Sequence, residues 1–299
     1  MATVAFDLTT ILHAMQKMAQ GMGHEAEWSP LIPDQDYIIK LLEERWIDLG
    51  EIGDLVALCS EHYAKLNAFL TEHGFEPTVS AFDPSEGLGV VSILDKTVNW
   101  ASGPGIKVDI FTEDGPKPGF ELPARDVTVF TTGGPGHLLR IATKEADTLW
   151  IYVPWKGNSS HNDLSGLDLF ILASEIMSGL GLYPEAGAFA GAHVPMVDFS
   201  VQPDLSFLLG MIVSNHMRSL AVLEAGQQFK LRMNEEGARV KVATNMSAFE
   251  TCIREPERFI VDTPFFLWFT HEGFEDLPLA VARVDFDSMK KPEGSLSEL

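Results

Sequence analysis

The chain has 299 residues, of which 45% are hydrophobic and 21% are charged. This composition is that of an ordinary globular protein and argues against a disordered or fibrous chain. Asp and Glu number 43 against 21 Lys and Arg, which gives a formal net charge of −22. A surface of that sign repels phosphates and anionic lipids, so we expect neither nucleic acid nor a membrane as a partner.

The N-terminal segment and the cysteines bear on location. The opening MATVAFDLTT lacks the basic segment and long apolar run of a secretory signal, so we expect a cytoplasmic protein. Cys59 and Cys252 are the only cysteines, too few for a disulfide framework, which favours a reducing compartment. A single disulfide between them and a free thiol at Cys252 are both compatible with the sequence.

The first third of the chain is predicted to be mainly helical. Apolar residues recur at helical spacing in residues 6–22, 36–48 and 52–71, and Trp28, Ser29 and Pro30 interrupt the pattern between the first two. Each apolar stripe is typical of a helix face that packs on a core. We therefore expect three helices before residue 75.

After residue 75 the pattern changes to short strands separated by Gly/Pro turns. Strands are expected at residues 87–94, 106–111, 127–132, 138–142, 149–153, 228–233, 258–270 and 277–284. Helices are expected at residues 167–180 and 203–215. Helices followed by a strand-rich part predict an α+β fold rather than alternating β-α units.

Motifs of common enzyme and cofactor sites are missing from the sequence. Gly133-Gly134-Pro135-Gly136 lies between two expected strands and lacks the lysine of a phosphate loop, so it is interpreted as a hairpin turn. The nine histidines do not have the spacing of a hydrolytic metal site, and no Gly-x-Ser-x-Gly elbow occurs. Cys252 could act as a nucleophile only beside a base that the sequence does not place. We expect no metal, no cofactor and no enzymatic activity.

One stretch near the C-terminus has an unusual order of patterns. From residue 238 to 246 the side chains alternate, with Ala238, Val240, Val242, Thr244 and Met246 on one face. Residues 247–257 have mixed polarity and no period, which is typical of an exposed loop. Residues 259–269 are apolar enough for a fully buried strand.

These segments resemble the serpin family. Asn234-Glu235-Glu236-Gly237 is similar to the proximal hinge of a serpin reactive loop, residues 261–265 resemble the signature that follows the loop, and residues 277–284 resemble the closing strand. The match extends upstream to residues 194–211, to Trp100 in a central strand, and to Ser29-Pro30 as the buried start of a core helix.

The resemblance implies one serpin-like domain over residues 1–288. It has a large mixed or antiparallel main sheet, smaller sheets, a mainly helical and abbreviated part at 1–75 and a sheet-rich part at 76–288, followed by a disordered tail at 289–299. The sequence departs from the family pattern in the short spacing between Ser29 and Trp100, in Gln227 where the family has a histidine, and in the hinge. The hinge has Ala238 in place of a threonine, and Val240 and Val242 in place of alanines.

The implied activity is inhibition of a protease, with the serine proteases as the candidate class, by cleavage of a reactive loop at about 237–257 and insertion of that loop as a strand. The hinge comprises Glu235, Glu236, Gly237, Ala238, Val240 and Val242. The scissile region comprises Thr251, Cys252, Ile253 and Arg254, because counting from Gly237 and counting back from Pro264 give different registers.

The loop leaves two questions open. If Arg254 is the specificity residue, the target is trypsin-like. If Thr251 or Cys252 is the specificity residue, the target is a protease with a small pocket. Arg254 is equally compatible with a solvated charge that has no role in specificity. The alternative function is a non-inhibitory binding protein of the same fold, whose loop is permanently exposed or already inserted.

Overall fold

The computed structural model describes most of the chain. The described residues are 2–23, 26–132, 134, 136–145, 147–156, 161, 163–187, 189–238 and 257–293, and for Gly237 and Ala238 only the backbone is described. The expected scissile region therefore lies outside the described residues.

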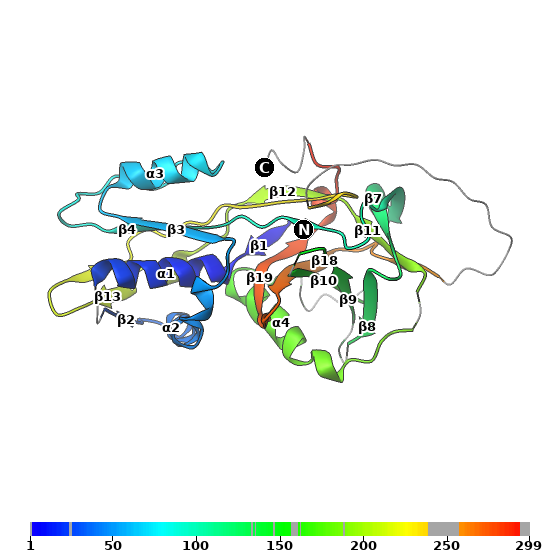
Figure 1. Ribbon diagram of the computed structural model, residues 1–299, viewed down its shortest axis with the longest axis horizontal. Coiled ribbons are helices and arrows are strands. Elements are labelled where there is room, and N and C mark those ends of the chain that lie inside the picture. Colours follow the sequence, from blue (N-terminus) through cyan, green and yellow to red (C-terminus); the bar gives the residue numbers. More distant parts are fainter. Residues whose placement is uncertain are drawn as a thin grey trace. The chain divides into compact units, whose positions relative to one another are not determined.

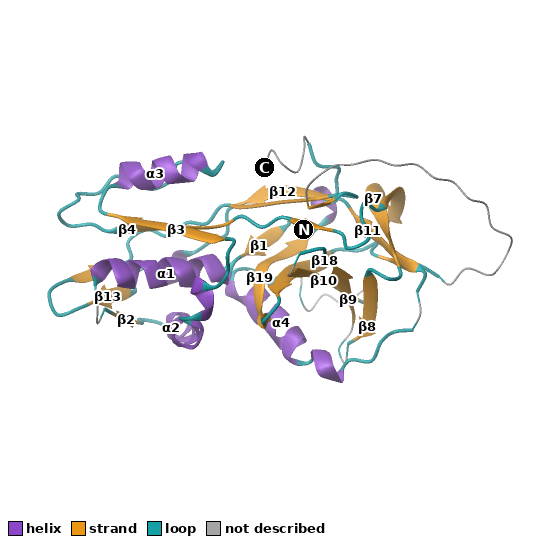
Figure 2. Ribbon diagram, in the orientation of Figure 1, coloured by secondary structure: helices purple, strands orange, loops and turns teal. Residues whose placement is uncertain are grey.

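The contacts divide the chain into two compact units. Unit 1 comprises Met1–Phe6, Thr97–Val201 and Phe229–Leu299, and unit 2 comprises Asp7–Lys96 and Gln202–Gln228. Helices and strands occur in both (Figures 1 and 2). The expected α+β class is confirmed, whereas a single domain over 1–288 stays a prediction.

Unit 1 contains a six-stranded antiparallel sheet. Its spatial order is β1 (Val4–Phe6), β19 (Phe274–Val284), β18 (Phe265–His271), β10 (Asp147–Pro154), β9 (Gly136–Ala142) and β8 (Val127–Thr131). Strand β18 is buried at six successive positions because both faces of the sheet are covered, which explains its continuous apolar run. Helix α4 (Leu167–Ser178) packs on β19 and β1.

A second sheet of unit 1 has four strands. Its order is β17 (Phe259–Ile260), β11 (Gly191–Pro195), β7 (Gly115–Pro123) and β6 (Ile106–Thr112). Strand β7 was not expected from the sequence, because Pro116 and Pro118 lower strand propensity and cannot donate to a ladder. Two short pairs complete the unit: β12 (Val197–Val201) with β15 (Phe229–Met233), and β5 (Val98–Asn99) with β16 (Gly237–Ala238).

Unit 2 is built around helix α1 (Leu8–Met22), which packs on the antiparallel pair β3 (Leu55–Ser60) and β4 (Gly89–Leu94). The side chain of Asp7 caps α1 by accepting a 2.9 Å hydrogen bond from the Thr10 amide. The other elements are α2 (Pro33–Arg45), α3 (Tyr63–Glu72) and the three-stranded sheet of β14 (Ser219–Ala221), β13 (Ile212–Ser214) and β2 (Glu27–Ser29).

Three expectations about unit 2 are wrong. Residues 55–60 form strand β3 rather than part of a helix. A short apolar run of this kind fits either element, and the pairing with β4 decides in favour of the strand. The helix expected at 203–215 is replaced by a 3-10 helix, Ser206–Leu208, and by β13, with Gly210 between them at φ +81°. Ser29 is exposed on β2, and the next helix, α2, begins only at Pro33, so Ser29-Pro30 is not the buried start of a core helix. The helix that does have a buried residue at its start is α1, which Asp7 caps.

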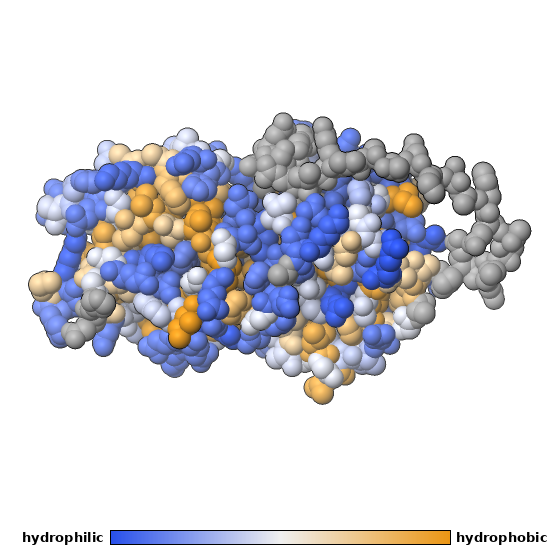
Figure 3. All heavy atoms as spheres, viewed as in Figure 1, coloured by the Kyte–Doolittle hydropathy of each residue, from blue (hydrophilic) through white to orange (hydrophobic). Residues whose placement is uncertain are grey.

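The face drawn in Figure 3 is mainly hydrophilic, with separate hydrophobic patches. Within the described ranges no helix is both long enough and apolar enough to span a bilayer. The same ranges hold no group of three or more His, Cys, Asp or Glu side chains placed to bind a metal ion.

Candidate reactive-loop hinge

The first residues of the expected hinge form a turn and a short strand in unit 1. After β15, Glu235 and Glu236 make a turn, and the Glu236 amide donates a 2.9 Å hydrogen bond to Asn234 Oδ1. The chain then runs antiparallel to β5 as β16, with Gly237 opposite Asn99 and Ala238 opposite Val98. The first residues of the alternating segment are therefore already paired with a neighbouring strand.

Trp100 fixes the start of this turn. It is fully buried and stacks on Phe120, with ring centroids 5.5 Å apart. Its indole Nε1 donates a 3.1 Å hydrogen bond to the main-chain oxygen of Asn234. The residue that follows β15 is therefore tied to the residue that follows β5.

Glu235 is held by Gly105, which precedes β6, and by Lys107 on β6. Its main-chain oxygen accepts a 2.7 Å hydrogen bond from the Gly105 amide. Its carboxylate pairs with Lys107 Nζ at 2.8 Å, and its side chain is only 13% exposed. The hydrogen bond to Glu235 and the charge of that carboxylate raise the pKa of Lys107, so the lysine stays cationic.

The far edge of β5 is bound by the segment that connects β9 to β10. Glu145 accepts hydrogen bonds from the Asn99 amide at 2.7 Å and from Asn99 Nδ2 at 2.6 Å. The Lys144 amide donates to the Asn99 oxygen at 2.9 Å, and Trp100 forms an antiparallel bridge with Thr143. Strand β5 is thus enclosed between this segment and the hinge.

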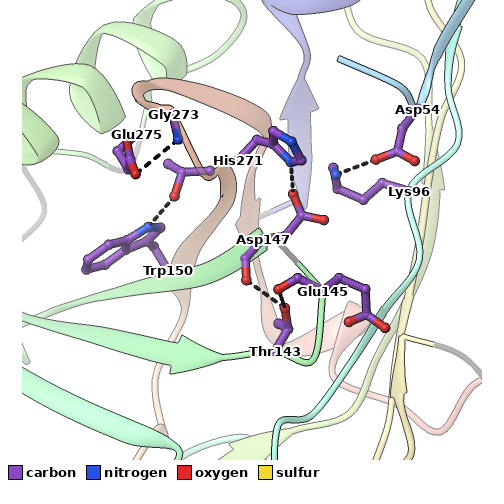
Figure 4. A network of polar contacts seen from close by, with 10 residues as sticks. Asp54, Lys96, Thr143, Glu145, Asp147, Trp150, His271, Gly273 and Glu275 are labelled. Carbon is purple, nitrogen blue, oxygen red and sulfur yellow. Dashed lines mark hydrogen bonds and ion pairs between the residues drawn. The ribbon is translucent and has the colours of Figure 1, made fainter. Parts of the chain in front are cut away.

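A further polar network supports the connecting segment. Thr143 Oγ1 donates to the main-chain oxygen of Asp147 at 2.6 Å, and the Asp147 carboxylate contacts His271 Nδ1 at 2.8 Å (Figure 4). The Asp147 side chain is 5% exposed. The start of β10 is therefore fastened to the end of β18 as well as to Thr143.

The distal end of the loop is also anchored in unit 1. Arg258 Nε donates a 2.7 Å hydrogen bond to Glu121 on β7, and the other carboxylate oxygen of Glu121 lies 3.4 Å from His193 Nε2 on β11. Strand β17 then pairs with β11 in parallel. Both ends of the segment 239–256 are consequently attached to the same unit.

The structure describes only part of the expected site. Glu235 and Glu236 are placed together with the backbone of Gly237 and Ala238. The expected hinge residues Val240 and Val242 and the scissile candidates Thr251, Cys252, Ile253 and Arg254 lie outside the described residues. Whether Cys59 pairs with Cys252 is left untested for the same reason. Cys59 is half-buried, and burial followed by the charge of Glu61 raises the pKa of its thiol.

Sequence reasoning missed the groups that hold the hinge. Lys107 contacts Glu235 across 128 positions, Glu121 contacts Arg258 across 137, and Glu145 contacts Asn99 across 46. Single charged residues in exposed turns and strands carry no local pattern that distinguishes them from solvated charges. Trp100 is the exception, because the family resemblance placed it in a central strand.

Gln227 occupies a different environment, within unit 2. Its Oε1 accepts a 3.0 Å hydrogen bond from the Asp7 amide, while its Nε2 donates to the Asp7 oxygen at 2.8 Å and to Thr10 Oγ1 at 2.9 Å. The residue at the expected histidine position thus fastens the segment before β15 to the start of α1.

No protein-family model and no curated protein sequence matches the chain. Solved structures do match. Serpin-12, a serine protease inhibitor of Manduca sexta, aligns with a TM-score of 0.59 at 12% identity, over 98% of this chain and 95% of its own. Human glycosylated kallistatin aligns with a TM-score of 0.57 at 13% identity, over 97% and 92% of the two chains.

A binding protein is among the matches as well. Human thyroxine-binding globulin, solved with thyroxine, aligns with a TM-score of 0.57 at 12% identity, over 95% of this chain and 91% of its own. The chain therefore has a serpin-like fold, which confirms the resemblance seen in the sequence. Because every identity is low, the likeness shows the fold alone.

Proposed function

We propose that the protein inhibits a protease by loop cleavage followed by insertion of the cleaved loop as a strand beside β5. The observation that carries the proposal is the pairing of Gly237 and Ala238 with β5. Insertion has to begin at the hinge, and there the first residue pairs are already in register. The alternation from Ala238 to Met246 continues the same strand period, so further residues can add to the ladder without a change of face.

Insertion is favourable for two reasons. Each added backbone hydrogen bond contributes about 0.5–1.5 kcal/mol net, and alternate apolar side chains leave water. A gain of several such bonds raises the melting temperature of a chain of this size by about 10–20 °C. The protease, held as an acyl-enzyme on the cleaved loop, would be carried along with the moving strand.

The first experiment is to nick the loop with a promiscuous protease and to compare thermal unfolding before and after. A rise of the expected size supports insertion, whereas an unchanged melting temperature contradicts the inhibitory mechanism. Incubation with trypsin-like and elastase-like proteases should then give a covalent complex that resists denaturant. A trapped trypsin-like protease would favour Arg254 and an elastase-like one Thr251 or Cys252. Mass spectrometry of the released C-terminal fragment then identifies which of Thr251, Cys252, Ile253 and Arg254 precedes the cleaved bond.

A pair of charge substitutions tests the register of the inserting strand. Val242→Arg places a charge on the face that alternation assigns to the core, and should abolish the thermal shift. Ala243→Arg adds the same charge on the opposite face and should retain it. Equal behaviour of the two variants would mean that the hinge register is wrong.

The second candidate function is a non-inhibitory binding protein whose loop does not move. The pairing of β16 with β5 is also compatible with this alternative. A hinge that is permanently paired forms fewer new backbone hydrogen bonds when the loop is cleaved, so cleavage stabilises the protein less. The stiff, β-branched Val240 and Val242 also favour it, because they replace the small residues of the family hinge. A nicked protein with an unchanged melting temperature and no covalent complex would support this alternative.

A further inference from the structure

Strand β5 is a small template for an inserting strand. It is two residues long, and Val98 and Trp100 are fully buried while Asn99 between them is half-buried. On one side β5 faces the hinge, where Asn99 lies opposite Gly237. A strand this short has few backbone contacts of its own, so its position depends on what binds its other edge.

That other edge is bound mainly through Asn99. The Glu145 carboxylate takes both the main-chain amide and the side-chain amide of this one residue, at 2.7 Å and 2.6 Å. Two N–H donors on one carboxylate fix the main chain and the side chain of Asn99 together, and hydrogen bonds to a charged acceptor are stronger than neutral ones. The Lys144 amide, 2.9 Å from the Asn99 oxygen, completes the backbone pairing on this side.

We propose that Glu145 is a positioning residue for loop insertion: it holds Asn99, and through Asn99 the edge of β5, in the register that receives Gly237 and the residues after it. This inference rests on the proposed function. Both carboxylate oxygens of Glu145 accept hydrogen bonds from Asn99, so its effect on the hinge is exerted through Asn99. When the cleaved loop arrives, a fixed edge is ready to pair, whereas a mobile edge must first be ordered.

The Thr143 contacts explain how Glu145 itself is kept in place. Thr143 Oγ1 lies 3.3 Å from the Glu145 main-chain oxygen and 2.6 Å from that of Asp147, whose carboxylate contacts His271 (Figure 4). The carboxylate of Glu145 is therefore presented from a segment that is tied into the six-stranded sheet. The position of β5 is therefore set by contacts that lead back to the six-stranded sheet.

The test is the rate at which the nicked protein becomes thermostable, measured in wild type and in Glu145→Gln. The amide keeps the shape of the side chain but offers one oxygen to two N–H donors, so one charge-assisted hydrogen bond is lost. We expect stabilisation after nicking to slow by about tenfold, which is the effect of losing one such bond. Against any protease that wild type inhibits, the variant should also consume more inhibitor molecules per protease trapped.

Two further variants separate positioning from simple destabilisation. Glu272→Gln makes the same change at an exposed glutamate of the β18–β19 turn and should keep the wild-type rate. The double variant Asn99→Ala/Glu145→Gln should be slowed by less than the product of the two single effects, because both single changes weaken the same side-chain hydrogen bond. A structural role alone would lower the melting temperature of the intact protein without altering the insertion rate.

The outcomes distinguish the two proposals. If wild type gains no stability on nicking, the proposed function fails and the role of Glu145 fails with it. If wild type gains stability and Glu145→Gln does so at the same rate, the inhibitory function stands and the positioning role is wrong.

Discussion

Trp100 and Asn234 are joined by a 3.1 Å hydrogen bond from the indole Nε1 to the main-chain oxygen. The tryptophan is fully buried, so the indole N–H that donates this hydrogen bond is not accessible to water. The contact links the residue after β5 to the residue before the hinge turn. Stability of the hinge should therefore depend on the indole N–H and not only on the volume of the ring.

Trp100→Phe removes that N–H and retains an aromatic ring to stack on Phe120. We expect the free energy of unfolding to fall by about 1–3 kcal/mol, because a partly buried hydrogen bond is lost and the smaller ring leaves a gap in the core. Denaturant unfolding followed by circular dichroism measures the change. Trp155→Phe is the matched control, since Trp155 is 52% exposed and should change stability by less than about 0.5 kcal/mol. Equal effects of the two substitutions would contradict the role given to the indole N–H.

Lys107 and Glu235 form an ion pair whose sign can be reversed. Lys107→Glu places two carboxylates together at the first turn of the hinge and should destabilise the protein, while Lys107→Glu/Glu235→Lys should recover most of the loss. Because Lys107 is 65% exposed, solvent screens the pair and the effect should be about 0.5–1 kcal/mol. Thermal unfolding at low and high salt provides the measurement. A loss that persists in the double variant, or that does not shrink in high salt, would speak against an ion pair.

Local patterns in the sequence predicted the elements that depend on local physics. The apolar stripe of α1 was predicted because it recurs at the period of a helix. The alternation expected from Ala238 to Met246 stays a prediction, because residues 239–246 lie outside the described residues. Strand β3 was misread because an apolar run of its length fits a helix or a strand, and only its partner β4 decides between them. Strand β7 was missed because prolines argue against a strand, although Pro116 and Pro118 fit this ladder.

The hinge residues were predicted from a resemblance to a family, whereas the groups that contact Glu235 and Asn99 were not predicted. Glu145 reaches Asn99 across 46 positions, and Lys107 reaches Glu235 from another sheet. Contacts of this kind are set by the tertiary fold, so a single sequence holds no signal that distinguishes them from solvated charges. Gln227 was noticed only as a departure from the family, whereas the structure gives it three hydrogen bonds.

Gln227→Ala tests that cluster. The substitution removes an acceptor for the Asp7 amide and a donor for the Asp7 oxygen and Thr10, all partly buried. We expect a loss of about 2–3 kcal/mol in the free energy of unfolding. Gln228→Ala is the matched neighbour, because the Gln228 amide binds the backbone of Glu76 at exposed positions and should contribute less than about 1 kcal/mol. If Gln228→Ala proved the more damaging change, the importance assigned to the Gln227 contacts would be wrong.

His13 on α1 should make unit 2 sensitive to mild acid. The ring is 3% exposed and Nδ1 lies 3.0 Å from Ser92 Oγ on β4. Burial, with a smaller effect of Lys17, lowers the pKa of His13 from 6.5 to about 4. The folded state therefore binds this proton less readily than the unfolded chain. The contribution of neutral His13 to the free energy of unfolding should be fully present above pH 6.5, should decrease as the pH drops from 6.5 towards 4, and should change no further below that.

The size of this dependence follows from the shift and amounts to about 3 kcal/mol across the window. Urea unfolding measured at intervals between pH 7 and pH 4 gives the slope. His13→Gln removes the titrating group. The free energy of unfolding of this variant should therefore fall by about 3 kcal/mol less than that of wild type over this pH range, even if the variant is less stable at neutral pH. His62→Gln alters an exposed histidine and should keep the wild-type slope. A His13→Gln slope identical to that of wild type would show that another group carries the pH dependence.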